Sequence, residues 1–212
     1  MPFSPPPDSY SSTPHDEHLP AGTELWRVHP SKYASTAFNS TRTHRFFGGG
    51  RFDGTDDDPY SYIYAGFTKE TAVCETLLRD VPFEADTPRM LLPDVYEPRS
   101  LSRVVTTTDL KLLSLRTTPH LSRAYQDTWL VNAGNREYAQ TRHWGHWYRY
   151  HITWAQGLIW PSKRDVGNNA IILFGDRCTP HALLDGSEAY DFNTAAGRAE
   201  LSRVLQPLTA II

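Results

Sequence analysis

The part of the sequence that most constrains the fold is residues 48–79, where three local patterns follow one another without a break. It opens with G-G-G-R-F-D-G, continues through Y-S-Y-I-Y-A-G-F and ends with T-K-E-T-A-V-C-E-T-L-L-R-D. Successive glycines tolerate backbone angles that other residues avoid and let a ligand approach the main chain. Aromatic and β-branched residues then predict a strand over 60–67, and Thr68 is a good N-cap for a helix that runs to about Asp80. We therefore expect a glycine turn, a strand and a helix in direct succession.

The glycine turn matches neither of the common nucleotide-binding loops. It lacks the Gly-Lys-Ser/Thr ending of a phosphate-binding loop, and no G-x-G-x-x-G leads into a helix. The acidic insert that follows, residues 53–58, reads D-G-T-D-D-D. Its spacing does not fit a calcium loop, because Pro59 interrupts it and no glutamate closes it. The pattern predicts a solvated acidic turn instead.

The remaining patterns predict a single α+β domain over residues 21–212. Residues 1–20 hold six prolines and four serines with almost no apolar pattern, which predicts a disordered tail. Residues 109–115 fit either a strand or a helical turn. The other expected elements are strands at 24–29, 158–160 and 170–174, further strand material over 88–108, helical segments over 121–154 with a break near 132–135, and a terminal helix over 194–205.

Composition excludes several classes of protein. A net charge of -3 gives no overall basic field for nucleic acid, and no nucleic-acid-binding motif is present. No apolar run approaches the roughly 18–20 residues of a membrane span, and the N-terminus lacks the features of a secretory signal. Two cysteines, Cys74 and Cys178, do not make a disulfide framework. We expect a reduced cytoplasmic protein, and the pattern leaves open whether it forms a homo-oligomer.

Three histidines in the aromatic segment before Trp154 raise the question of a metal site. His143 and His146 have the spacing to share one helix face. However, no cysteine or carboxylate stands at ligand spacing, and H-E-x-x-H is absent. We expect an aromatic packing helix with His151 near its end, and no metal.

Five short motifs appear in a fixed order between residues 22 and 178. They are L-W-R-V, G-G-R-F, I-Y-A-G, A-V-C-E and L-I-W-P-S, the last followed by N-N-A-I-I-L-F. In this order the chain resembles the RES domain family, named for its arginine, glutamate and serine. The resemblance implies an ADP-ribosyltransferase-like fold with central mixed or antiparallel sheets flanked by helices. It also implies an NAD phosphorylase or NAD glycohydrolase, typically the toxin of a bacterial toxin–antitoxin pair, with a protein antitoxin as partner.

The positions that match the family motifs are Arg27, Arg51, Tyr64, Glu75 and Ser162. The resemblance implies that Glu75, Arg27 and Ser162 are catalytic and that Arg27, Arg51, Tyr64 and Ser162 bind substrate. NAD is then consumed as a substrate, with no cofactor, and inorganic phosphate is a possible co-substrate. Guanidinium groups suit pyrophosphate, and a carboxylate stabilises the oxocarbenium-like charge that develops when a glycosidic bond breaks. A tyrosine ring can stack on nicotinamide or adenine, and the serine hydroxyl could bind the carboxamide or a phosphate.

The sequence leaves other functions open. A protein ADP-ribosyltransferase would use the same motifs with a protein as acceptor, and a silent module would hold a nucleotide or a partner without chemistry. Local pattern alone favours a solvated strand position for Arg27 and a solvated helix position for Glu75. Val28 also stands where family members often carry an aromatic residue. The acidic insert would repel the phosphates of NAD or contact a basic partner.

Overall fold

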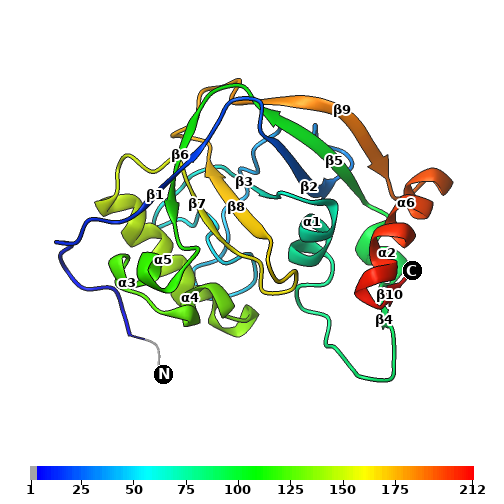
Figure 1. Cartoon of the computed structure of the whole chain (residues 1–212), viewed down its shortest axis with the longest axis horizontal. Coiled ribbons are helices and arrows are strands. Elements are labelled where there is room, and N and C mark those ends of the chain that lie inside the picture. The colour runs from blue at the N-terminus through cyan, green and yellow to red at the C-terminus, as the bar shows by residue number, and fades with distance from the viewer. Residues whose placement is uncertain (1–3) are drawn as a thin grey trace.

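One curled sheet of eight strands runs through the protein (Figure 1). The structure is a computed structural model, and it describes residues 4–212. The strand order is β1-β6-β7-β8-β3-β2-β5-β9, and every neighbouring pair is antiparallel except β6 and β7. The strands are β1 (Asp16–Leu19), β2 (Glu24–Pro30), β3 (Tyr62–Gly66), β5 (Arg99–Thr106), β6 (Leu110–Ser114), β7 (Gly157–Pro161), β8 (Asn169–Phe174) and β9 (Leu183–Asp191). A separate parallel pair joins β4 (Arg89–Met90) to β10 (Ala210–Ile211).

The helices gather at the two ends of this sheet (Figure 1). At one end α5 packs its Trp144 and Tyr148 into a core shared with β7 and β8. At the other end α1 buries Val73 and Cys74 against β5 and α6. The helices are α1 (Lys69–Thr76), α2 (Pro93–Tyr96), α3 (Thr118–Arg123), α4 (Thr128–Asn132), α5 (Tyr138–His151) and α6 (Ala195–Leu205), with short 3₁₀ turns at Asn135–Glu137 and Gln206–Leu208. None of the helices in residues 4–212 is both long enough and apolar enough to span a membrane.

The alternation of strand side chains places Arg27 apart from its bulky neighbours. Successive residues of a strand point to opposite faces of the sheet. Trp26 and Val28 therefore pack beneath α1, in the same cluster as Val73. Arg27, between them in the sequence and opposite Ser102 of β5, lies on the other face.

The predicted helix after Thr68 begins as expected but ends earlier. The Thr68 side chain accepts a hydrogen bond from the Thr71 amide and caps α1. The helix stops at Thr76 rather than near Asp80, because the amides of Leu77 and Leu78 both donate to the Val73 carbonyl. The bond from Leu78 spans five residues and closes a wider turn, in which both leucines are buried. The strands predicted at 24–29, 60–67, 158–160 and 170–174 are β2, β3, β7 and β8, and residues 109–115 contain strand β6.

The structure corrects the expectation of a disordered tail over residues 1–20. Residues 16–19 form β1, which pairs antiparallel with β6, and Leu19 is buried. Residues 1–3 lie outside the described residues. Low hydrophobicity does not prevent this order, because pairing with an edge strand uses main-chain hydrogen bonds and needs few apolar anchors.

Candidate active site

A cavity of about 660 Å³ opens between β2, β3 and α1, within the size range of small-molecule sites. Four of the five motif residues line it: Arg27 on β2, Arg51 after the glycine turn, Tyr64 on β3 and Glu75 on α1. Positions 11 to 48 residues apart in the sequence thus meet at one cavity. Further lining side chains that matter for its chemistry are His29, Arg79, Arg99, Tyr138 and Trp160.

Glu75 is held in place by Ser162, which follows β7. The Ser162 hydroxyl donates a hydrogen bond to Glu75 Oε1 at 2.6 Å. Its oxygen also accepts from the amides of Arg164 at 3.3 Å and Asp165 at 3.1 Å. Ser162 is 4% exposed and does not line the cavity. The geometry therefore makes Ser162 a positioning residue for Glu75, whereas the half-buried Glu75 borders the cavity.

The loop after Ser162 forms hydrogen bonds near the start of α1 and just beyond its end. Asp165 Oδ2 accepts from the Thr71 hydroxyl at 2.5 Å, near the helix start. Beyond the helix end, the guanidinium of Arg164 donates to the Arg79 carbonyl at 3.1 and 3.2 Å. Because the loop that follows β7 is hydrogen-bonded on both sides of Glu75, the Glu75 carboxylate is fixed relative to β7.

Arg27 is buried without a carboxylate partner among residues 4–212. Its Nη1 donates to the carbonyls of Ser35 at 2.7 Å and Ala37 at 2.9 Å. Burial lowers the pKa of Arg27 to about 10, so the side chain stays cationic at neutral pH. The expectation of a solvated strand arginine is thus wrong, and the charge faces the cavity.

The guanidinium of Arg51 lies near two aromatic rings. Its guanidinium carbon is 5.7 Å from the Tyr138 ring centroid and 5.8 Å from that of Trp160. Its Nη2 donates to the Ala133 carbonyl at 3.2 Å, and the Thr141 hydroxyl donates to the Arg51 carbonyl at 2.7 Å. α5 and the segment before it therefore fix this arginine on the cavity wall.

Asp53 organises the glycine turn from inside. It is 4% exposed, so the expectation of a solvated turn over residues 53–58 is wrong at this position. Its Oδ2 accepts from the Gly50 amide and the Thr43 hydroxyl, both at 2.7 Å, and its Oδ1 accepts from the Tyr64 hydroxyl at 2.9 Å. A Cβ at Gly50 would lie 2.5 Å from Asp53 Oδ1, so the turn requires glycine there. Exposed acidic side chains of the insert are Asp56 and Asp57.

The Tyr64 hydroxyl forms its hydrogen bonds with groups of the protein itself. Besides donating to Asp53, the oxygen accepts from the Phe52 amide at 2.8 Å. Burial, aided by the Asp53 charge, raises the pKa of Tyr64 well above its ordinary value. Only the ring of Tyr64, which meets Trp160 edge to face, is available to a ligand.

The family model of the RES domain matches residues 24–193. The chain belongs to the RES domain family. The structure is similar to a chain in the crystal structure of the M. tuberculosis MbcT–MbcA toxin–antitoxin complex, with 16% sequence identity, 91% of each chain covered and a TM-score of 0.60. That likeness shows the fold and confirms the predicted α+β, ADP-ribosyltransferase-like architecture. No curated protein matches the sequence.

The sequence motifs of this RES domain did not single out two further arginines at the cavity. Arg79 lies four residues after Glu75, and its guanidinium carbon is 5.2 Å from the Tyr138 ring centroid. Burial and the charge of Arg79 lower the pKa of Arg99, which has no carboxylate partner among residues 4–212. Arg79 could have been found from the helix predicted to run to Asp80, on which residues four apart share a face, although α1 itself ends at Thr76. Arg99 carried no such signal.

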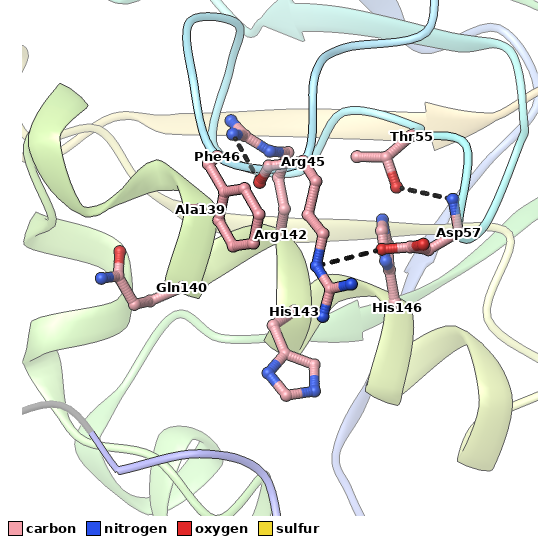
Figure 2. Close-up of a pocket in the computed structure, with 9 residues that line it drawn as sticks. All are labelled: Arg45, Phe46, Thr55, Asp57, Ala139, Gln140, Arg142, His143 and His146. Atoms are coloured by element: carbon pink, nitrogen blue, oxygen red, sulfur yellow. Dashed lines mark hydrogen bonds and ion pairs between the residues drawn. The ribbon is translucent and has the colours of Figure 1, made fainter.

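A second cavity of the RES domain, about 250 Å³, lies beside α5 (Figure 2). His143 and His146 both line it, as their spacing predicted. Phe46 and Arg45 of the preceding loop face them, and Arg45 Nε lies 3.4 Å from Asp57 Oδ2. Within residues 4–212 no three histidine, cysteine or acidic side chains are grouped to hold a metal ion.

Acid should destabilise this RES domain through His29. The ring is 5% exposed, with Nε2 2.9 Å from the Ser102 hydroxyl and Nδ1 3.1 Å from the Pro30 carbonyl. Burial and the Arg27 charge lower the pKa of His29 to about 4, whereas an unfolded histidine titrates near ~6.5. Between these values the unfolded state binds the extra proton, so stability falls as pH drops from 6.5 to 4.

We expect His29 to account for about 2 kcal/mol of that loss. Urea unfolding at pH 7 and pH 4.5 measures it. Carboxylates titrate in the same range, so the informative quantity is the difference between the unaltered chain and His29→Gln. The variant should lose less stability on acidification than the unaltered chain. Equal losses in both would show that His29 is not the group responsible.

Proposed function

We propose that the chain cleaves NAD at the nicotinamide–ribose bond, and that it is the toxin of a toxin–antitoxin pair. The observation that carries the proposal is Glu75, held by Ser162 at the edge of a cavity with four arginines. Three buried donors at this cavity also have no partner among residues 4–212: Arg27 Nε, Arg51 Nε and Trp160 Nε1. A buried unpaired donor costs on the order of 1–3 kcal/mol, which favours a site shaped for a ligand rich in acceptors.

The arrangement suits NAD chemistry in detail. Arg27 and Arg51 offer forked donors to the pyrophosphate. The rings of Tyr64 and Trp160 offer apolar faces to the nicotinamide. The Glu75 carboxylate would stabilise the positive charge that develops on the ribose as the bond to nicotinamide breaks. The bond electrons go to the pyridinium nitrogen, so nicotinamide leaves neutral and no general acid is required.

Charge at the cavity favours phosphate over water as the acceptor. Five cationic side chains line it, Arg27, Lys32, Arg51, Arg79 and Arg99, against the carboxylates of Asp53 and Glu75. Asp80, which does not line the cavity, pairs with Arg79 at 3.2 Å, so two positive charges remain in excess. NAD brings two phosphate charges and one pyridinium charge, so it neutralises only one of the two. A second anion such as inorganic phosphate would offset the rest.

The role as a toxin rests on family membership and on the fold. The similar structure is that of a toxin in complex with its antitoxin. We propose that a protein antitoxin likewise controls this chain, because a cell that makes an NAD-consuming enzyme needs it restrained.

The test is to incubate the purified chain with NAD, with and without phosphate, and to measure nicotinamide. We expect release that phosphate accelerates, with ADP-ribose 1″-phosphate as the second product. Release without phosphate dependence would assign water as the acceptor. Label transferred from NAD to a protein would assign ADP-ribosyl transfer instead. Absence of release and of transfer, with NAD still bound, would overturn the enzymatic proposal in favour of a silent binding module.

Arg99→Gln is expected to raise KM for phosphate about tenfold and to leave KM for NAD within about twofold. A charge-assisted hydrogen bond contributes roughly 1.5–3 kcal/mol, and tenfold corresponds to about 1.4 kcal/mol. Steady-state kinetics with phosphate varied at saturating NAD measures the change. Arg203→Gln is the matched control, because Arg203 pairs with Glu200 on the exposed face of α6, outside the cavity. An unchanged KM for phosphate would place the acceptor elsewhere while leaving NAD cleavage intact.

A further inference from the structure

The chain's own N-terminal segment, residues 4–13, covers an aromatic groove beside α5. In Figure 1 this segment runs past α3 and α5 before it enters β1. Trp147 Nε1 donates to the Pro7 carbonyl at 2.6 Å, and Trp144 Nε1 donates to the Ser4 carbonyl at 3.1 Å. Both indoles are buried in this state, at 2% exposure for Trp144 and 9% for Trp147.

The spacing of these contacts fits a polyproline II helix. Residues 4–7 read S-P-P-P. Proline fixes φ near −65° and biases the residue before it toward an extended backbone, so this run is set for polyproline II before it binds. That helix has three residues per turn and no internal hydrogen bonds, which leaves carbonyls three residues apart free on one side. Trp144 and Trp147, three apart on α5, present one indole donor to each of these two carbonyls.

A tyrosine anchors the other end of the segment. The Tyr10 ring meets the rings of Trp147 and Tyr125 edge to face, at centroid distances of 5.2 and 5.0 Å. Its hydroxyl donates to the Arg123 carbonyl at 2.9 Å, and the Ser11 amide donates to the Tyr125 hydroxyl at 3.1 Å. Tyr125 has φ 59°, a left-handed backbone that costs a non-glycine residue roughly 1–2 kcal/mol. This strain is retained where the Tyr125 ring forms a wall of the groove.

We propose that this groove, formed by Tyr125, Trp144, Trp147 and the Arg123 carbonyl, is a binding site for proline-rich segments of the form S-P-P-P-x-x-Y. Residues 4–10 occupy it within the chain, and a partner segment of the same chemistry occupies it by displacing them. Aromatic grooves with hydrogen-bond donors are a recurrent mode of polyproline II recognition. A tethered segment competes at an effective concentration on the order of mM, so a partner needs comparable concentration or a weakened tether. The proposal is independent of the NAD chemistry.

The first test weakens the tethered segment in the full-length chain with Pro6→Gly and Tyr10→Ala. Tryptophan emission should shift to the red as the two indoles hydrate. A synthetic peptide of residues 4–13 should restore the emission saturably, with a Kd of about 1 mM or below. A control peptide with all three prolines replaced by glycine and the tyrosine by alanine should have no effect. Failure of the first peptide up to about 5 mM, or equal action of both, would overturn the proposal.

The second test needs no substitution and covers a variant that fails to fold. The unaltered full-length chain is labelled with ¹⁵N at its indoles, and the peptide of residues 4–13 carries a spin label. Excess peptide should broaden the indole N–H signals of Trp144 and Trp147. The signal of Trp26, which lies in the α1 cluster, should stay sharp. Absence of broadening would show that the segment is a fixed part of the fold, and uniform broadening would show that the peptide does not bind in this groove; either result would overturn the proposal.

Discussion

Glu75→Gln should lower kcat for nicotinamide release by about 10²–10³-fold and leave KM for NAD within about threefold. The substitution keeps the size of the side chain and its oxygen toward the Ser162 hydroxyl, 2.6 Å away in the unaltered chain. It removes only the charge that would stabilise the oxocarbenium-like transition state. Steady-state kinetics, with NAD affinity measured separately by calorimetry, divides the loss between binding and chemistry.

Glu70→Gln is the control on the same helix. Glu70 lies in the first turn of α1 and does not line the cavity, so its loss should change kcat less than about twofold. Ser162→Ala tests the positioning role. It should lower kcat in the unaltered chain but add little in the Glu75→Gln background, because the two side chains act as one unit. Full activity in Glu75→Gln would remove the carboxylate from the mechanism.

Sequence patterns predicted the elements that have strong periodicity and clear ends. β2, β3 and the start of α1 were placed correctly because bulky strand residues, Pro30, glycine and Thr68 mark them. β9 was missed because L-L-D-G-S-E-A-Y-D is mostly polar and contains Gly186, as suits an edge strand with one partner. β1 was missed because its pairing with β6 depends on the main chain more than on side-chain type.

The site was predictable as a set of motif residues but not as a geometry. Local pattern left Arg27 solvated, because nothing in strand periodicity shows that the carbonyls of Ser35 and Ala37 fold back over its guanidinium. The hydrogen bond that holds the half-buried Glu75 comes from Ser162, 87 residues away in the sequence. Asp53 looked like the start of a surface acidic run, since the sequence does not show which of several aspartates turns inward.

That inward carboxylate has the largest expected effect on stability. Asp53→Ala should lower the free energy of unfolding by about 3–5 kcal/mol, because three donors lose an acceptor that carries a charge. The donors are the Gly50 amide, the Thr43 hydroxyl and the Tyr64 hydroxyl. Urea unfolding measures the change. Asp53→Asn keeps one acceptor oxygen and should lose less, about 1–2 kcal/mol.

Substitution of Asp53 should also weaken substrate binding at the cavity, since Arg51 directly follows Gly50, whose amide donates to Asp53. In Asp53→Asn, which should remain folded, KM for NAD is expected to rise about tenfold while kcat changes less, because the turn that presents Arg51 loosens and Glu75 stays on α1. Asp56→Ala is the matched control: its exposed carboxylate pairs with Arg42 at 3.2 Å, and its removal should cost within ~0.5 kcal/mol. Equal stability of the Asp53→Ala and Asp56→Ala variants would show that the buried network does not hold the glycine turn.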